Sequence, residues 1–173
     1  MNQILKKINS EKDLSIWARK LGGHLKPGLL ISLEGELGTG KTTFLRYLCQ
    51  GIESKDFFSA KNNFVHSPTF SLIHEYPFSI PVIHVDLYRL GGKNPLEVQH
   101  SLEDLGFRDY LTEKNLVFIE WFNRLPKGSY DPDLSFCFSF VDNVQKSTHL
   151  LDLRELGIFW TNSLDPKIQA FLS

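Results

Sequence analysis

The segment GELGTGKTT, residues 35–43, constrains the fold more than any other part of this 173-residue chain. Gly35, Gly40, Lys41 and Thr42 satisfy the Walker A spacing G-x-x-x-x-G-K-[ST]. In this motif the glycines let successive backbone N–H groups point at phosphate oxygens, the lysine reaches the β and γ phosphates, and the hydroxyl coordinates Mg²⁺. The segment therefore predicts a site for a nucleoside triphosphate with magnesium.

The residues on either side of the loop provide the context that the motif requires. The apolar run LLISLEG, residues 29–35, predicts a buried strand, and KTTFLRYLCQ, residues 41–50, predicts a helix that Gly51 ends. Strand, glycine-rich loop and helix thus follow in the right order. Within the loop and the first helical turn, we expect the nucleotide to contact Gly38, Thr39, Gly40, Lys41, Thr42 and Thr43.

Two acidic residues end apolar runs elsewhere in the chain. Asp86 ends VIHVD and Glu120 ends LVFIE, and each run has the composition of a strand buried on both faces. An acid at such a position is costly unless it has a partner, and either residue could be the Walker B acid. We expect both to serve the metal together with Thr42, and Glu120 also to orient the attacking water. The predicted catalytic residues are Lys41, Asp86 and Glu120.

The remaining patterns predict an α/β protein. Ser10 precedes an amphipathic helix, and residues 69–76 and 81–90 are expected to pair as an antiparallel hairpin. Asn94 and Pro95 suit the start of another helix, broken near Gly106. Residues 134–141 and 148–156 suggest a second hairpin. We therefore expect a single domain over residues 1–173 with the P-loop NTPase fold, in which a mostly parallel central sheet has flanking helices and added antiparallel strands.

Composition argues against several other classes of protein. The 19 basic and 20 acidic side chains balance, so the totals support no general attraction to nucleic acid or to a membrane surface. No run approaches the roughly 20 apolar residues that span a bilayer, and the N-terminus lacks a secretory signal. Two cysteines are too few for a disulfide scaffold. We expect a soluble cytoplasmic protein without membrane contact.

The segment HSPTF, residues 66–70, has two interpretations. It lies between the glycine loop and Asp86, where nucleotide-sensing switch segments often occur, and Thr69 could offer its hydroxyl to magnesium or to the γ-phosphate. Alternatively, it is a turn that starts a strand, in which Pro68 sets the backbone. The residues alone leave both interpretations open.

Several segments taken together identify a family. GELGTGKTTFLR, SPTFSLIHEY, HVDLYRL, LEDLGFRDYL and VFIEWF occur in the order and spacing of the bacterial TsaE family, and the resemblance covers roughly residues 10–125. It implies an ATPase that acts with TsaD-like and TsaB-like proteins in forming threonylcarbamoyladenosine on tRNAs that read codons beginning with A. It implies ATP and Mg²⁺ as cofactors, and contact with tRNA only indirectly.

The same resemblance assigns roles to particular residues. It implies that Lys41 and Thr42 hold phosphate and magnesium, that Asp86 is the Walker B acid and that Glu120 is a magnesium and catalytic residue. It also implies nucleotide contacts for four further residues, which are Thr69 in the switch segment, Trp121 lining the site, and Ser10 and Lys146 near the base or ribose. One departure concerns the segment after Trp121, where the family commonly has proline and this chain has Phe122.

Two rival functions stay open at this point. A small-molecule kinase shares the phosphate loop but needs an acceptor site and an arginine-bearing lid, and the arginines of this chain form no compact cluster in the sequence. A nucleotide-gated binding module would act through its ATP-bound shape, with negligible turnover. Such a binding module would not need Glu120 to orient an attacking water molecule. A GTPase is disfavoured because no N-K-x-D motif follows the acids.

Overall fold

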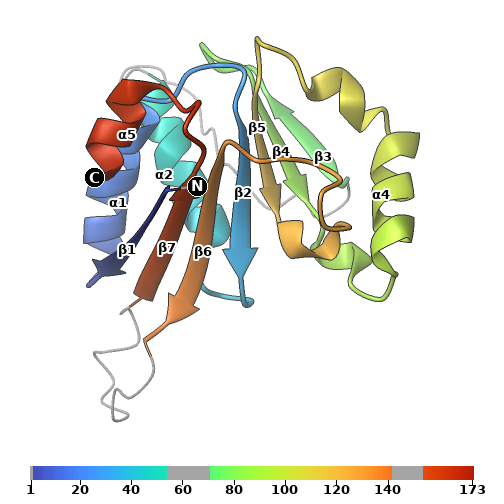
Figure 1. Ribbon diagram of the computed structural model, residues 1–173, viewed down its shortest axis with the longest axis horizontal. Coiled ribbons are helices and arrows are strands. Elements are labelled where there is room, and N and C mark those ends of the chain that lie inside the picture. The colour runs from blue at the N-terminus through green and yellow to red at the C-terminus, as the bar shows by residue number, and fades with distance from the viewer. Residues whose placement is uncertain (1, 54–70, 142–153) are drawn as a thin grey trace.

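One seven-stranded sheet organises the chain, with helices on both of its faces (Figure 1). The computed structural model describes residues 2–53, 71–141 and 154–173. The strands lie in the order β1-β7-β6-β2-β5-β4-β3. Their bounds are β1 Asn2–Ile8, β2 Leu30–Gly35, β3 Ile73–Tyr76, β4 Val82–Asp86, β5 Leu116–Glu120, β6 Leu134–Phe140 and β7 Arg154–Trp160.

The centre of the sheet is parallel and its edges are antiparallel. Strand β2 pairs in parallel with β5 and β6, and β4 pairs in parallel with β5. The pairs β3–β4, β6–β7 and β1–β7 are antiparallel. All residues of β4 and β5 are buried, as their continuous apolar sequences predict for strands covered on both faces. The predicted α/β class with added antiparallel strands is confirmed.

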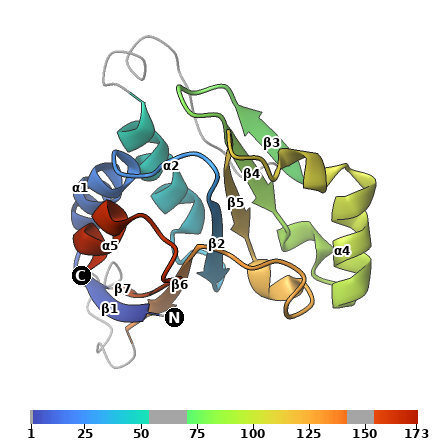
Figure 2. The same ribbon diagram turned by 45° about the horizontal axis from the view of Figure 1, so that its top comes forward.

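Helices cover the two faces unequally (Figure 2). Helices α1 (Glu11–Gly22), α2 (Lys41–Ile52) and α5 (Pro166–Leu172) pack on one face, where Phe44, Phe118 and Phe136 belong to the larger apolar cluster. Helix α4 (Pro95–Asp104) lies on the opposite face, over a smaller cluster that contains Ile83 and Ile119. Because side chains alternate along a strand, the same buried strands supply both clusters.

Helices α1 and α2 pack closely because glycines lie at their contact. A Cβ atom on Gly22 would lie 2.2 Å from the Leu48 carbonyl oxygen, and one on Gly51 would lie 2.0 Å from the Arg19 carbonyl oxygen. Both distances are shorter than any tolerated contact, so only glycine allows this approach. The prediction that Gly51 ends its helix is wrong, because α2 continues to Ile52 and the glycine serves packing between helices.

Other predictions from the sequence have mixed outcomes. Helices α1 and α4 begin directly after Ser10 and Asn94, as predicted, and both residues are N-caps; Asn94 forms a capping box with Glu97. Gly106 separates α4 from a 3₁₀ turn over Phe107–Tyr110. Strand β1 was not predicted, because its partner β7 lies at the other end of the sequence. The last predicted hairpin is formed by β6 and β7, which pair antiparallel; residues 154–156 of its second predicted strand lie in β7, and residues 148–153 lie outside the described residues.

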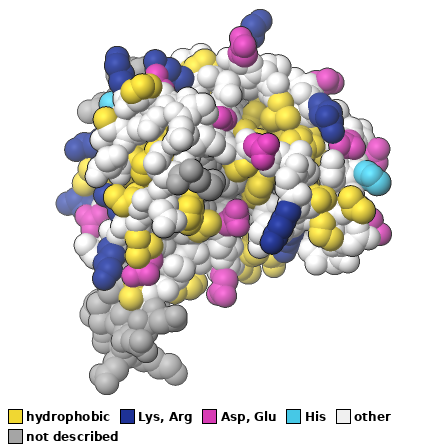
Figure 3. All heavy atoms as spheres, viewed as in Figure 1, with side chains coloured by type: hydrophobic (Ala, Val, Ile, Leu, Met, Phe, Trp, Pro, Cys, Tyr) yellow, Lys and Arg dark blue, Asp and Glu magenta, His cyan; other side chains and the backbone are white. Residues whose placement is uncertain are grey.

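Charged side chains of both signs occur across the face of the molecule shown in Figure 3. This mixture agrees with the nearly balanced totals of the sequence. Among the described residues, no helix is both long and apolar enough to cross a membrane.

Candidate functional site

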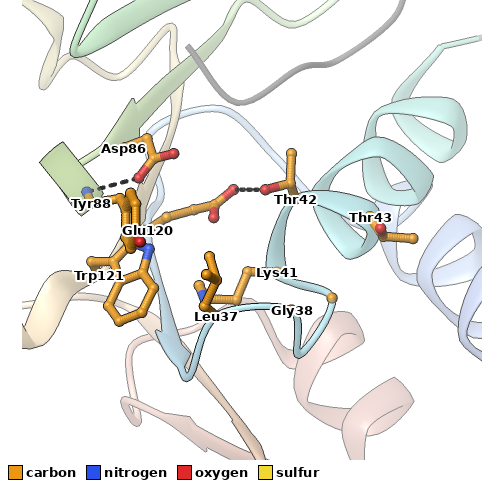
Figure 4. Close-up of a pocket in the computed structure, with 10 residues that line it drawn as sticks. Leu37, Gly38, Lys41, Thr42, Thr43, Asp86, Tyr88, Glu120 and Trp121 are labelled. Carbon is orange, nitrogen blue, oxygen red and sulfur yellow. Dashed lines mark hydrogen bonds between the residues drawn. The ribbon is translucent and has the colours of Figure 1, made fainter. Parts of the chain in front are cut away.

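A pocket of about 220 Å³ lies where the glycine loop meets the carboxyl ends of the central strands (Figure 4). One wall comes from the loop and the first turn of α2, and the other comes from the ends of β4 and β5. In an open α/β sheet, this edge is where ligands bind. The lining residues are Leu37, Gly38, Gly40, Lys41, Thr42, Thr43, Asp86, Tyr88, Glu120 and Trp121.

The loop between β2 and α2 is shaped to present backbone amides. Gly40 is the N-cap of α2 with φ 102°, a left-handed conformation that favours glycine. The buried hydroxyl of Thr39 donates a 2.8 Å hydrogen bond to the Glu36 carbonyl, so this side chain braces the loop and does not line the pocket. The N–H groups of the first turn of a helix have no acceptor within the helix and attract anions.

Lys41 is held inside the loop. Its ammonium donates 2.8 Å hydrogen bonds to the carbonyl oxygens of Gly35 and Glu36, and it lies 4.1 Å from the centre of the Trp121 ring. Burial lowers the pKa of Lys41, while the carboxylates of Glu120 and Asp86 act in the opposite direction. The structure thus keeps a cation at the floor of the pocket, where its hydrogen-bond acceptors are two neutral carbonyls.

The two acids predicted from the sequence lie side by side. Asp86 and Glu120 are register partners at the ends of the parallel strands β4 and β5 and are 9% and 2% exposed. Asp86 Oδ1 accepts a 2.9 Å hydrogen bond from the backbone N–H of Tyr88 (Figure 4). Both acids line the pocket, so residues 34 positions apart in the sequence meet at a common edge opposite the glycine loop.

Glu120 also reaches across the pocket to the helix. The hydroxyl of Thr42 donates a 2.7 Å hydrogen bond to Glu120 Oε1 (Figure 4). The same oxygen lies 3.0 Å from Nε2 of His84, a histidine with no exposed surface. The three side chains proposed as metal ligands, those of Thr42, Asp86 and Glu120, therefore surround one end of the pocket.

Trp121 lines the pocket at the point where the chain turns away from β5. Its φ is 61°, and among the described residues it is the one non-glycine residue with a positive φ. A 3₁₀ turn, Phe122–Arg124, follows, and Phe122 occupies its first position, where proline also fits. Arg124 lies over the Trp121 and Tyr88 rings and donates to the carbonyl oxygens of Leu87 and Tyr88. The chain thus follows a defined path after Trp121 without proline.

Sequence reasoning missed Arg154 at the start of β7. A Cβ atom on Gly40 would lie 3.6 Å from Arg154 Nε, so the guanidinium lies beside the glycine loop. No motif marks this arginine, and the β7–β6 pairing brings it there from the far end of the chain. Leu37 and Tyr88 were also missed as lining residues, although both are neighbours of predicted ones.

Four predicted nucleotide contacts are not among these lining residues, and one of them is Thr39, which braces the loop as described above. Ser10 accepts a hydrogen bond from the backbone N–H of Asp13 as the N-cap of α1, and it does not line the pocket. Thr69 and Lys146 lie outside the described residues, as does the whole HSPTF segment. Their roles stay predictions.

Comparison with known proteins decides the family. The sequence profile of the family described as "Threonylcarbamoyl adenosine biosynthesis protein TsaE" matches residues 8–148, most of the chain. The chain belongs to the TsaE family. Every residue of the pocket described above lies within the matched range.

Relatives of the TsaE family extend this match. The protein named tRNA threonylcarbamoyladenosine biosynthesis protein TsaE from Rickettsia typhi is 32% identical over 84% of this chain and 96% of its own length. Its namesakes from Rickettsia conorii and Bacillus subtilis are 38% and 33% identical over 66% of this chain. Those two matches cover 58% and 63% of the relatives' own lengths. The chain therefore spans less than two thirds of the length of each of these two relatives.

A solved structure shares the fold. The crystal structure of YdiB from Bacillus subtilis superposes with a TM-score of 0.67 over 99% of this chain and 94% of its own, at 22% identity. At this identity the likeness concerns the fold, and the arrangement of helices around the mixed sheet is therefore shared.

Proposed function

We propose that this TsaE-family chain binds ATP with magnesium and hydrolyses it in the service of tRNA threonylcarbamoyladenosine biosynthesis. One observation carries the proposal: Lys41 and Thr42 at the start of α2 face Asp86 and Glu120 across a single pocket. A phosphate-binding cation, a hydroxyl and two carboxylates are the groups that magnesium-dependent phosphoryl chemistry needs. The names of the relatives, which place them in biosynthesis of the modified tRNA nucleoside, supply the biological context.

The donor atoms fit magnesium better than a transition metal. Thr42, Asp86 and Glu120 offer hard oxygen atoms, and Mg²⁺ is typically held by one or two carboxylates, waters and substrate phosphates. Among the described residues, no group of three or more His, Cys, Asp and Glu side chains forms a metal site of the protein alone. When bound, Mg²⁺ neutralises charge on the phosphate oxygens. The protein's contribution is to place the hydroxyl of Thr42 and the two carboxylates.

The chain's own residues then have distinct tasks. The amides of the loop and of the first turn of α2 bind phosphate oxygens, and Lys41 exchanges its two carbonyl partners for the β and γ phosphates. Glu120 orients the water that attacks the γ-phosphate, since it is a buried carboxylate that faces the pocket. Arg154, beside Gly40, contributes a second positive charge near the phosphates.

We propose further that the fold is that of the P-loop NTPases. The strand, glycine loop and helix order and the parallel strands β6-β2-β5-β4 with acids at their ends support this assignment. TsaD-like and TsaB-like proteins are the proposed partners, and contact with tRNA is indirect. We expect slow hydrolysis by the chain alone and faster hydrolysis in their presence.

The test is magnesium-dependent phosphate release from ATP, measured first with the chain alone and then with TsaD, TsaB and tRNA added. Stimulation by these partners, lost when EDTA replaces magnesium, supports the proposal. The control is Lys41→Ala under the same conditions. Phosphate transferred to a small acceptor would instead establish a kinase. Tight ATP binding without turnover in the full mixture would establish a nucleotide-gated binding module.

A further inference from the structure

A buried histidine lies directly behind the acids of the pocket. His84 occupies the middle of β4, two residues before Asp86, and the exposed fractions of the His84 and Glu120 side chains are 0% and 3%. Residues two apart on a strand point to the same face, so His84 and Asp86 share the face that α2 covers. His84 Nε2 lies 3.0 Å from Glu120 Oε1. The histidine does not line the pocket.

The ring nitrogens of His84 have different surroundings. Nε2 faces the carboxylate of Glu120, whereas Nδ1 is buried and has no hydrogen-bond partner among the described residues. A bare nitrogen lone pair is cheaper to bury without a partner than an N–H group, and a carboxylate oxygen can only accept. These contacts assign the tautomer with the proton on Nε2, which donates to Glu120.

This hydrogen bond fixes one oxygen of Glu120. Oε1 accepts from His84 Nε2 and from the Thr42 hydroxyl, from two different elements of the fold. With Oε1 held on two sides, rotation of the carboxylate is restricted and Oε2 keeps a defined direction. The contact with Thr42 is one that magnesium would replace, since Thr42 is a proposed ligand. The contact with His84 comes from outside the pocket, and His84 is not a proposed ligand.

We propose that His84 is a positioning residue, which orients the Glu120 carboxylate for magnesium through the Nε2–H donor. The inference rests on the proposed function, because it gives the metal a defined ligand direction. The strand neighbours of His84 are apolar and its ring stacks on Tyr76 with the centroids 6.5 Å apart, but neither contact needs a nitrogen donor directed at Glu120. Groups that hydrogen-bond to metal ligands orient them, and their loss typically lowers metal affinity or activity by roughly 10-fold to 100-fold.

Three substitutions separate the hydrogen bond from packing. His84→Gln places an amide nitrogen near the position of Nε2, His84→Asn places it near Nδ1 and out of reach of Glu120, and His84→Leu removes both donors. The control is His74→Leu, because His74 is the register partner of His84 on β3 but is exposed. For each variant the half-saturating Mg²⁺ concentration for ATP hydrolysis is measured, together with binding of Mn²⁺ in the presence of ATP, by electron paramagnetic resonance.

We expect His84→Leu and His84→Asn to weaken Mn²⁺ binding by roughly 10-fold or more, and His84→Gln to restore most of it. ATP binding in EDTA should stay within twofold of the wild type, because the loop and Lys41 bind the phosphates. Thermal unfolding identifies any variant that does not fold. Unchanged Mn²⁺ binding in His84→Leu would overturn the proposal. Equal losses of Mn²⁺ affinity in folded His84→Gln and His84→Leu would also overturn it.

A second measurement tests the hydrogen bond between His84 and Glu120 and needs neither bound nucleotide nor ATP hydrolysis. Nitrogen-15 NMR of the histidine rings in the nucleotide-free chain reports which ring nitrogen carries the proton. The expected result is protonation of His84 at Nε2 alone, and a proton on Nδ1 would overturn the inference. If wild-type chain binds no Mn²⁺ with ATP, the proposed function fails, whereas the NMR result still decides whether His84 donates to Glu120.

Discussion

Thr42 and Glu120 are 78 positions apart in the sequence, yet a 2.7 Å hydrogen bond joins the threonine hydroxyl to the carboxylate. The contact connects the first turn of α2 to the end of β5. It therefore closes one end of the pocket and brings two proposed magnesium ligands within reach of one ion.

Lys41→Ala is expected to weaken ATP binding by roughly 100-fold, because a charge-assisted hydrogen bond to phosphate is lost from a buried position. Titration with a fluorescent ATP analogue measures this. The control is Lys167→Ala, which removes the same charge from an exposed position on α5. Equal affinity of Lys41→Ala and wild type for ATP would show that the glycine loop is not the phosphate site.

Asp86→Asn and Glu120→Gln are expected to reduce ATP hydrolysis by roughly 100-fold while leaving the folded state intact. Each amide keeps the size of the side chain and an oxygen acceptor, so the side chain at position 86 can still accept from the Tyr88 N–H. Phosphate release and thermal unfolding are measured together. The comparison variant is the exposed Glu113→Gln. Wild-type turnover in either site variant would remove that acid from the mechanism.

Arg154→Met is expected to weaken ATP binding by about 10-fold to 100-fold, since a charged donor beside the loop is lost. Arg154→Lys should recover part of the affinity because it keeps the charge but not the planar guanidinium. Lys7→Met serves as the control, because it removes a positive charge from an exposed position on β1. Calorimetric titration with ATP decides the outcome, and identical affinities for all four chains would exclude Arg154 from the site.

Gly51→Ala is expected to destabilise the fold by roughly 1–3 kcal/mol, because the added methyl group would collide with the Arg19 carbonyl and force α1 and α2 apart. Urea unfolding measures the change. Gly92→Ala is the matched control, since a Cβ atom at Gly92 meets nothing within 4 Å. Equal stability of the two variants would mean that the helices separate without cost.

The Cys137 thiol is expected to react slowly in the folded chain. Burial raises its pKa from 9.0 to about 11, so at pH 8 the reactive thiolate is about 100-fold scarcer than in the unfolded chain. Because the folded state holds this proton more tightly, its contribution to stability is present below about pH 9 and is lost as the pH rises toward 11. Mass spectrometry of alkylated peptides at increasing pH measures the rate. Alkylation of native Cys137 at the rate found in urea would contradict burial.

Local sequence patterns determined much of this protein. Features that depend on residues close together in the chain could be predicted from the sequence. They are the glycine loop, the two acids that end strands, and the helix starts at Ser10 and Asn94. A continuous apolar run predicts a strand buried on both faces, and the residue that ends it lies at the edge of the sheet. The two strand ends thus predict that Asp86 and Glu120 lie at one edge of the sheet, where they are register partners.

Tertiary structure decided the features that depend on distant pairing. Strand β1 forms because β7 lies beside it, and Arg154 reaches Gly40 because β7 folds back on β6. The contact of His84 with Glu120 and the tight packing at Gly51 likewise join residues from separate elements. The sequence by itself determined which residues can do chemistry and which elements carry them. Only the fold decided which side chains meet, because a contact between distant segments depends on the packing of every element between them.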